Sequence, residues 1–290
     1  MSPKPLNLLI AESEPKEARE ERRQSVGRSS GETFAARLAR LAPGASLTRI
    51  KPADPSVDLP DAAGLAAYDG VLLTGSPLHL YEDTAETRRV IGFMRDVFES
   101  GTPSFGSCAG LQVATVAAGG RVRRMAKRRE AGFARRLFPT DVGRDHPLLR
   151  GRPPAFDAAA IHTDEVERLP DGALLLASNS VTEVQAAEIR CGNGTFWGVQ
   201  YHPELSLFEV AAALRRQAAE IVKDGLASDE DALERQARAI EQLHEAPDRT
   251  DLVWPLGLDE QTVRADARLT EIRNFLEHLV LPTRERRGRG

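Results

Sequence analysis

The chain contains few of the residues that mark several specialised classes of protein. It has only two cysteines, Cys108 and Cys191, in 290 residues. Two cysteines are too few for a disulfide-stabilised scaffold or for a cysteine-rich zinc module. No apolar run approaches the roughly 18 residues that a membrane-spanning helix needs. We therefore expect no disulfide framework, no metal site and no membrane partner.

Aromatic residues and excess basic charge are scarce as well. Aromatics make up 5% of the chain, and 39 Lys and Arg residues stand against 43 Asp and Glu residues, a net charge of −4. Nucleic-acid-binding proteins usually combine a basic surface with stacking rings, so we do not expect a nucleic-acid partner. The apolar patch at residues 6–10 is too short for a signal-peptide core. The sequence therefore favours a cytoplasmic protein, and we predict no cofactor.

The residues that are present describe a globular α/β chain. Up to about residue 224, short β-leaning apolar runs alternate with amphipathic segments of helical length, which favours a mostly parallel sheet with helices on both faces. From about 155 to 201 the strands follow one another with turns between them, which predicts added antiparallel ribbons. The expected strands are residues 6–11, 45–50, 70–74, 103–107, 155–162, 173–178, 182–189 and 195–201. The expected helices are residues 31–41, 87–99, 110–118 and 206–222.

After residue 225 the pattern becomes almost purely helical. One apolar stripe runs through residues 233–243, behind a helix cap at Ser228, and a second runs through residues 269–279. We expect a break at 246–256 and a frayed arginine-rich tail at 284–290. Because a domain typically has about 150 residues, a chain of this length can hold one large domain and an extension. The pattern predicts a catalytic domain at 1–224 and a helical C-terminal extension at 225–290.

The most informative segment lies between an expected strand and an expected helix. Residues 106–112 read Gly-Ser-Cys-Ala-Gly-Leu-Gln, which places Cys108 at a glycine-flanked corner of the nucleophile-elbow type. The positive end of the following helix favours a thiolate and a developing oxyanion. A small buried cysteine at a strand end is an equally good interpretation of this motif alone.

A second segment supplies the groups that such a nucleophile needs. Residues 198–204 read Gly-Val-Gln-Tyr-His-Pro-Glu, with His202 at the end of a late strand and Glu204 beyond a proline-forced turn. A histidine base oriented by a carboxylate is the usual partner of a catalytic cysteine. The two motifs together favour a Cys108, His202 and Glu204 triad that meets only through the tertiary fold.

With a third motif, Leu-Thr-Gly-Ser-Pro at 73–77, the sequence resembles the class I (triad-type) glutamine amidotransferases. The resemblance covers roughly residues 6–224 and is nearest to stand-alone relatives of the amidotransferase domain of GMP synthase. It implies a flavodoxin-like fold and hydrolysis of the γ-amide of glutamine. In that reaction Cys108 forms a γ-glutamyl thioester, His202 transfers the proton and Glu204 orients His202.

The resemblance also implies the residues around the reacting amide. Backbone N–H groups of Gly75, or its neighbour, and of Ala109 would bind the oxyanion, and Gln112 would contact the substrate. His162 and Thr163 fall where the family often has a His-Ser pair that meets the amino-acid end of glutamine. The ammonia would pass to an acceptor or to a synthetase on a partner chain.

One departure from the family pattern keeps other functions open. Ala109 stands where a larger Leu, Tyr or Trp is common, and a smaller side chain should open the pocket wall. The same triad could therefore serve a hydrolase of another γ-glutamyl amide or peptide. A third alternative is a regulatory subunit without catalytic activity.

The remaining polar features are expected to be structural or solvated. The basic stretch at 121–136 lacks interleaved aromatics, so we interpret it as a solvated face. The charged segment at 12–28 and the Gly-Arg-Ser-Ser-Gly run at 27–31 are interpreted as a mobile segment before a helix. Cys191 is interpreted as part of a turn. Surface positions are expected for the histidines without ligand-spaced partners, which are His79, His146, His244 and His278.

Overall fold

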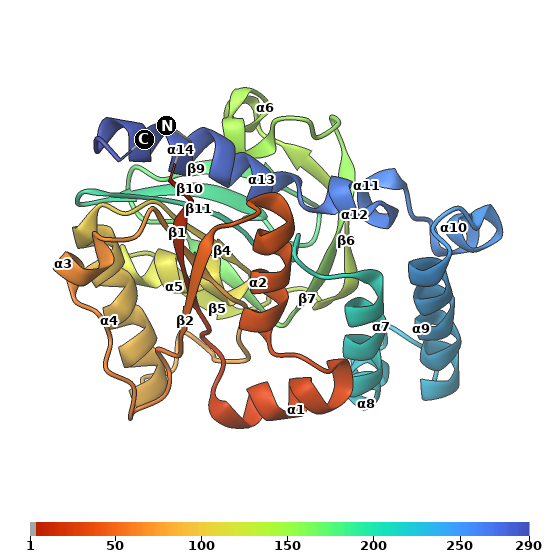
Figure 1. The fold of residues 1–290 in the computed structure, drawn as a ribbon. Helices are drawn as coiled ribbons and strands as arrows, with labels where there is room; N and C mark the ends of the chain where they lie inside the picture. The colour runs from red at the N-terminus through yellow and green to blue at the C-terminus, as the bar shows by residue number, and fades with distance from the viewer. Residues whose placement is uncertain (1–3, 290) are drawn as a thin grey trace.

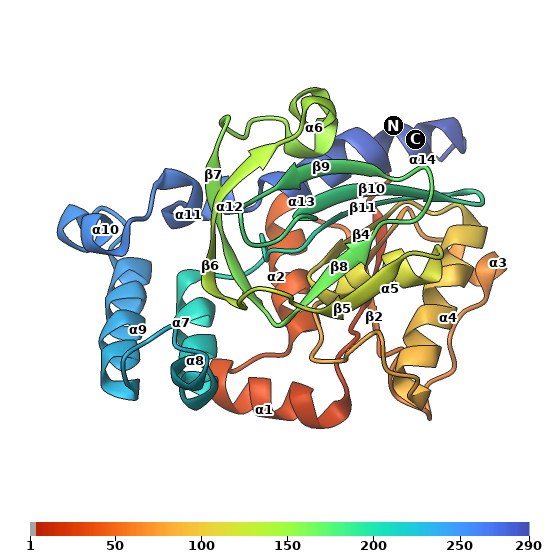
Figure 2. The same ribbon diagram turned by 180° about the vertical axis from the view of Figure 1, so that it is seen from behind.

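The computed structural model describes residues 4–289, and their ribbon is seen from two sides in Figures 1 and 2. Within that range nine strands form one mixed sheet in the order β2-β1-β3-β4-β11-β10-β9-β6-β7, and β5 pairs with β8 in a separate ribbon. The strands are β1 (Asn7–Ala11), β2 (Ser46–Ile50), β3 (Gly70–Leu73), β4 (Ser104–Ser107), β5 (Arg121–Arg124), β6 (Glu130–Pro139), β7 (Phe156–His162), β8 (Asp164–Arg168), β9 (Leu174–Ser178), β10 (Ala186–Cys191) and β11 (Gly194–Val199). The predicted α/β class with added antiparallel strands is confirmed.

The first half of the sheet is parallel. β1 pairs with β2 and β3, and β4 pairs with β3 and β11, all in the parallel sense. Every residue of β3 and β4 is buried, as a strand covered on both faces requires. Parallel strands end at one edge of a sheet, so the segments that follow β1, β3, β4 and β11 gather there. In open α/β sheets this edge is the usual ligand-binding edge.

Two helical layers cover the parallel strands. On one face, α2 (Ser30–Leu41) and α13 (Thr270–Phe275) share a buried cluster with alternate residues of β1, including Leu8 and Ile10. On the other face, α4 (Ala85–Ser100) and α5 (Ala109–Ala117) pack on Leu9 and the neighbouring strands. The short α3 (Ala62–Leu65) lies beside α4 (Figure 1). The alternation of β1 side chains between two cores is what a central strand demands.

The second half of the sheet is antiparallel and contains strands that the sequence did not indicate. β10 pairs antiparallel with β11 and β9, and β6 joins β9 to β7. The basic stretch at 121–136 is mostly strand and only partly solvated. In β5, Val122 is buried between exposed arginines, while Arg129 is only 8% exposed. α6 (Asp141–Asp145) and the short turn η1 (Pro147–Leu149) follow β6.

The segment at 12–28 is ordered, contrary to the expectation of a mobile segment. It forms α1 (Lys16–Val26), in which Arg19 and Arg22 are buried. Arg19 pairs with Asp54 at 2.6 Å and Arg22 pairs with Glu209 at 3.0 Å. These ion pairs let a charge-dense helix pack against the protein, and periodicity of apolar residues cannot reveal them.

The long helix expected at 206–222 is divided into α7 (Leu207–Arg216) and α8 (Ala218–Lys223). α9 (Glu230–Glu245) packs on α7 through the predicted stripe of Leu233, Ala237, Ile240 and Leu243, but its cap is Asp229 and not Ser228. The expected break holds a further helix, α10 (Thr250–Leu256), and short turns continue the chain through α11 (Glu260–Val263) and α12 (Ala265–Arg268). The placement of the domain boundary at residue 224 stays a prediction.

The last residues described are anchored to the segment that precedes β1. After α13 the chain continues through η2 (Leu276–Val280) and α14 (Leu281–Arg286). Arg284 donates to the carbonyl of Lys4, so the expectation of a frayed tail is wrong for the residues described up to 289. Within residues 4–289 no helix has the length and apolar character that crossing a bilayer demands.

Candidate active site

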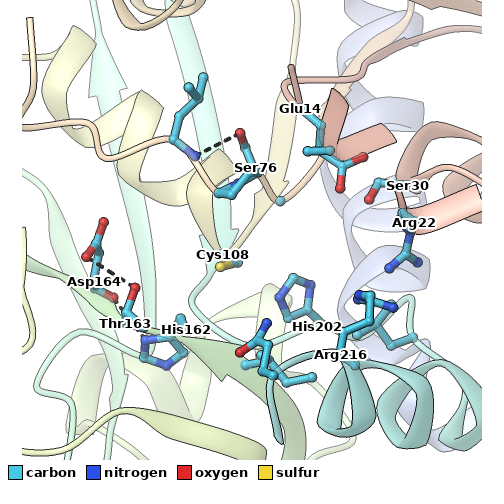
Figure 3. Close-up of a pocket in the computed structure, with 18 of the residues that line it drawn as sticks. Glu14, Arg22, Ser30, Ser76, Cys108, His162, Thr163, Asp164, His202 and Arg216 are labelled. Carbon is cyan, nitrogen blue, oxygen red and sulfur yellow. Dashed lines mark hydrogen bonds between the residues drawn. The ribbon is translucent and has the colours of Figure 1, made fainter. Parts of the chain in front are cut away.

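Cys108 occupies the sharp corner between β4 and α5. Its backbone has φ 52° and ψ −112°, a conformation that non-glycine residues rarely adopt and that surrounding structure must hold in place. The flanking glycines allow close packing here. A Cβ on Gly106 would lie 2.7 Å from the carbonyl carbon of Gly110, and a Cβ on Gly110 would lie 2.8 Å from the Leu73 oxygen. The strained corner directs the thiol into the cavity shown in Figure 3.

The structure brings His202 and Glu204 to the same corner. Nδ1 of His202 lies 2.7 Å from Oε1 of Glu204, which leaves Nε2 for the Cys108 sulfur. The hydroxyl of Ser107 donates to the same Glu204 oxygen at 3.0 Å. The His202 amide donates to the carbonyl of Ala159 at 2.7 Å, which fixes the chain beyond β11. The three residues expected to form a triad therefore meet at one corner of the same cavity.

The charges around His202 determine its protonation. Burial by itself lowers the pKa of His202, but the Glu204 carboxylate and the Cys108 sulfur oppose that effect and raise the pKa to about 10. An imidazolium that faces a sulfur and is backed by a carboxylate is a proton donor at neutral pH. This arrangement suits a thiolate nucleophile with an adjacent general acid.

The two expected oxyanion residues lie on either side of Cys108. A Cβ on Gly75, in the loop after β3, would lie 2.9 Å from Cε1 of His202 and 3.7 Å from Cβ of Cys108. The glycine therefore lets the loop backbone approach the reacting atoms. Ala109 is the first residue of α5, where backbone N–H groups have no partner within the helix.

The other expected substrate residues line the same cavity, but their side chains are buried to different extents. Gln112 is 2% exposed and donates to the Asp164 carbonyl and to Gln200 Oε1, each at 3.1 Å. It therefore joins α5 to β8 and to the end of β11. His162 and Thr163 form the turn between β7 and β8, where the Thr163 side chain is half-buried.

A buried carboxylate holds His162 in place. Glu130 is 4% exposed and accepts hydrogen bonds from Asn179, Thr182 and Gln185, with the His162 ring at 2.9 Å. Burial by itself raises the pKa of Glu130, but these donors, His162 foremost, hold it below its ordinary value. The second ring nitrogen of His162 bonds the Asp164 carbonyl at 2.9 Å. The turn is thus fixed without any ligand.

The cavity has a volume of about 460 Å³ and extends to both sides of Cys108 and His202 (Figure 3). We call one side the β7–β8 wall, formed by His162, Thr163 and Asp164. His79, expected to be a surface residue, lies beside this wall with Nδ1 2.6 Å from Oδ2 of Asp164. The opposite side is the α1 wall, formed by Glu14, Arg22, Ser30 and Arg216. The reacting residues lie between the two walls.

The α1 wall was missed from the sequence. The position of Glu14 is the one feature of the sequence that could have indicated it, because Glu14 comes three residues after the carboxyl end of β1, at the ligand-binding edge of the sheet.

The expectation of a surface position for His146 is wrong, since this residue is buried beside Glu188. Across residues 4–289 no group of three or more His, Cys, Asp and Glu side chains is arranged to hold a metal ion.

Comparison with known proteins assigns the family. Residues 33–220 match the family model described as glutamine amidotransferase class-I. The chain belongs to this family. A solved glutamine amidotransferase from Thermotoga maritima has the same fold, with a TM-score of 0.64 at 17% identity over 95% of this chain and 98% of that one.

Two curated relatives differ in how much of the chain they cover. A gamma-glutamyl-L-1-hydroxyisopropylamide hydrolase from a Pseudomonas species is 39% identical over 289 residues, 97% of this chain and 96% of the relative. A glutamine-hydrolysing GMP synthase subunit from Methanoculleus marisnigri is 32% identical over 151 residues, which is 52% of this chain and 73% of that protein. The similarity to the hydrolase thus includes the C-terminal helices.

Proposed function

We propose that this protein hydrolyses γ-glutamyl amides, releasing glutamate and an amine larger than ammonia. The observation that carries the proposal is the two-sided cavity. The cavity extends to both sides of Cys108 and His202. We assign one wall to the glutamyl half of the substrate and the other to the substituent on the leaving nitrogen. The full-length similarity to a gamma-glutamyl-L-1-hydroxyisopropylamide hydrolase supports this choice among the activities of the family.

The orientation of the substrate follows from the acid. His202 must protonate the leaving nitrogen, so the amine lies on the His202 side of Cys108, toward the α1 wall. The acyl chain then extends toward the β7–β8 wall, where the Thr163 turn meets its amino-acid end. This assignment agrees with the fixed geometry of that turn, because every substrate would share the same glutamyl half.

The first chemical step forms a thioester. The Cys108 thiolate attacks the γ-carbonyl carbon, a C–S bond forms, and the carbonyl electrons move onto oxygen. The N–H groups of Ala109 and of Gly75 or its neighbour stabilise that oxyanion. When the tetrahedral intermediate collapses, the C–N bond breaks and the proton of His202 passes to the departing amine.

The second step regenerates the enzyme. Neutral His202 takes a proton from water, which attacks the thioester carbon, and the C–S bond breaks to release glutamate and the Cys108 thiolate. Glu204 keeps His202 in the required orientation through both steps. Each cycle consumes one water molecule and needs no cofactor.

The proposal is tested with glutamine and γ-glutamyl isopropylamide as competing substrates. We expect kcat/KM for the alkylamide to exceed that for glutamine by about tenfold or more, since binding of the substituent adds to the same chemistry. Cys108→Ala should abolish both activities, while Cys191→Ala, the matched control at the other cysteine, should retain them. A clear preference for glutamine would overturn the proposal.

Glutamine hydrolysis with transfer of ammonia is the second candidate, because the chain also resembles a glutamine-hydrolysing GMP synthase subunit. A preference for glutamine would favour that candidate, and so would stimulation of glutamine hydrolysis by a synthetase partner. If Cys108 reacts with neither substrate and a glutamine-like electrophile does not label it, the chain is a non-catalytic subunit.

A further inference from the structure

The α1 wall has polar groups that the protein itself does not saturate. Glu14 is 8% exposed, and within residues 4–289 its Oε2 atom has no hydrogen-bond partner. A buried acceptor without a partner costs free energy, and such groups in folded proteins usually have a function. The Glu14 carbonyl accepts a bond from Arg19, which fixes the backbone of residue 14 while its carboxyl group lines the cavity. Burial raises the pKa of Glu14, and the charge of Arg22 and a hydrogen bond with Ser30 act against that rise.

Arg216 is the second group of this wall that could bind a ligand. It is half-buried at the end of α7 and donates to the Ser25 hydroxyl at 2.8 Å. In the part of the chain that the structure describes, it has no carboxylate within ion-pair distance, whereas the neighbouring Arg22 is paired with Glu209. Burial, followed by the charge of Arg22, lowers the pKa of Arg216. The wall therefore combines an unpartnered acceptor with a cation that has no ion-pair partner.

This pair of groups discriminates between ligands by charge. An ammonium group would be attracted to Glu14 but repelled by Arg22 and Arg216. A carboxylate would be attracted to Arg22 and Arg216 but repelled by Glu14 and by Glu21, which also lines the cavity. A neutral hydroxyl can donate to the carboxylate and accept from the guanidinium at the same time. A charged substituent of either sign thus meets two repulsive partners, and a hydroxyl meets none.

We propose that Glu14 and Arg216 form a subsite for the leaving amine and recognise a hydroxyl group on its short alkyl substituent. The hydroxyl donates to Oε2 of Glu14 and accepts from Arg216. The inference rests on the proposed function, since it assigns the α1 wall to the amine half of a γ-glutamyl amide. It adds a preferred substituent and the residues that select it.

Three substrates that differ at one carbon test the subsite. γ-Glutamyl isopropylamide, γ-glutamyl hydroxyisopropylamide and γ-glutamylalanine carry a methyl, a hydroxymethyl and a carboxylate group at that position. In the wild type we expect kcat/KM for the hydroxylated amide to exceed the other two by about tenfold or more, the discrimination that one hydrogen bond to a charged group provides.

Glu14→Gln removes the negative charge and keeps the size of the side chain. We expect kcat/KM for the hydroxylated amide to differ from that for the isopropylamide by less than about threefold. We also expect kcat/KM for γ-glutamylalanine to rise. Arg216→Gln should also lower the ratio of kcat/KM for the hydroxylated amide to kcat/KM for the isopropylamide. Glu17→Gln, on the exposed face of α1, should leave the kcat/KM ratios unchanged. Because each ratio is measured on one variant, partial loss of folded protein cancels.

The outcomes separate this inference from the proposed function. If the wild type hydrolyses the hydroxylated amide and the isopropylamide equally well, or prefers γ-glutamylalanine, the subsite assignment is wrong and γ-glutamyl amide hydrolysis stands. An unchanged ratio in Glu14→Gln also overturns the subsite. If none of the three amides is hydrolysed, the proposed function fails and the inference fails with it.

Discussion

The two walls of the cavity differ in how completely the protein satisfies their polar groups. At the β7–β8 wall, His162 is bonded through both ring nitrogens, and Glu130 behind it has four partners. At the α1 wall, an oxygen of Glu14 has no hydrogen-bond partner among residues 4–289, and the Arg216 guanidinium donates to the Ser25 hydroxyl without a carboxylate partner in that range. The polar groups of the first wall are bonded within the protein, whereas our proposal is that a ligand bonds those of the second. This difference suits a constant acyl half and a selected amine half.

Among variants that keep the Cys108 nucleophile, the largest effect is expected from a change that acts on the acyl and amine halves of the substrate equally. The Glu204 carboxylate orients His202 and raises the pKa of the imidazole. Because Glu204→Gln removes this carboxylate, kcat/KM should fall by roughly 10²–10⁴ for every substrate. The raised pKa keeps the acid protonated until the pH approaches about 10. Without the carboxylate, the alkaline limb of the kcat/KM profile should move to lower pH. A limb that stays in place would contradict the role of Glu204.

The next effect tests the oxyanion side of Cys108. In Gly75→Ala the new Cβ would lie 2.9 Å from Cε1 of His202, so the imidazole has to shift. A displacement of that kind should reduce kcat by roughly 10–100-fold without changing the selectivity between amines. Steady-state kinetics with two amides measure this, and Gly92→Ala, where a Cβ has open space, is the control. A change in selectivity would argue against a common reaction centre.

A smaller effect on rate, with a larger effect on stability, is expected at the β7–β8 wall. Glu130→Gln weakens the bonds to His162 and should cost about 1–3 kcal/mol of unfolding free energy. KM should rise by the same factor for all γ-glutamyl amides. Urea denaturation and kinetics check these outcomes. A substrate-dependent change in KM would break the distinction between the walls.

The pH dependence of that stability loss has a definite sign. The native pKa of Glu130 is below its ordinary value of 4.5. Its stabilisation is therefore present above the unfolded-state pKa and is lost as the pH falls through the native pKa. The difference in unfolding free energy between wild type and Glu130→Gln should shrink on acidification below that range.

The smallest effect is expected behind His202. Tyr201 precedes His202 and donates to Glu271 of α13 at 2.8 Å, while Arg152 pairs with the same carboxylate. Tyr201→Phe removes one bond and leaves the ion pair, so it should cost about 1 kcal/mol of stability. Activity toward all amides should change by less than about threefold. A larger, substrate-dependent loss would show that the C-terminal helices take part in selectivity.

The predictable part of the site is local in sequence. Cys108 follows a strand between two glycines, and His202 and Glu204 are two residues apart, so short motifs were sufficient to identify them. Eight of the nine strands of the large sheet, all but β6, were predicted, as were the helices of nine or more residues apart from α1, because apolar residues repeat at strand and helix periods.

The elements that could not be predicted contain charged residues that are buried in the folded protein. Their partners are far away in the sequence. Arg22 meets Glu209 across 187 positions of the sequence, so the residues of α1 were interpreted as a mobile segment. Glu14 was missed for the same reason, because its burial depends on how α1 packs. The strand at Glu130 was hidden within a basic stretch, since its carboxylate finds its donors only in the folded sheet.

Mass spectrometry of the enzyme, quenched during turnover of γ-glutamyl hydroxyisopropylamide, tests the central claim most directly. We expect a γ-glutamyl adduct on the peptide that contains Cys108, with the free amine already released into solution. The same adduct should form from the isopropylamide and from glutamine, because only the amine half differs. Hydrolysis without such an adduct, or an adduct at another residue, would contradict the account.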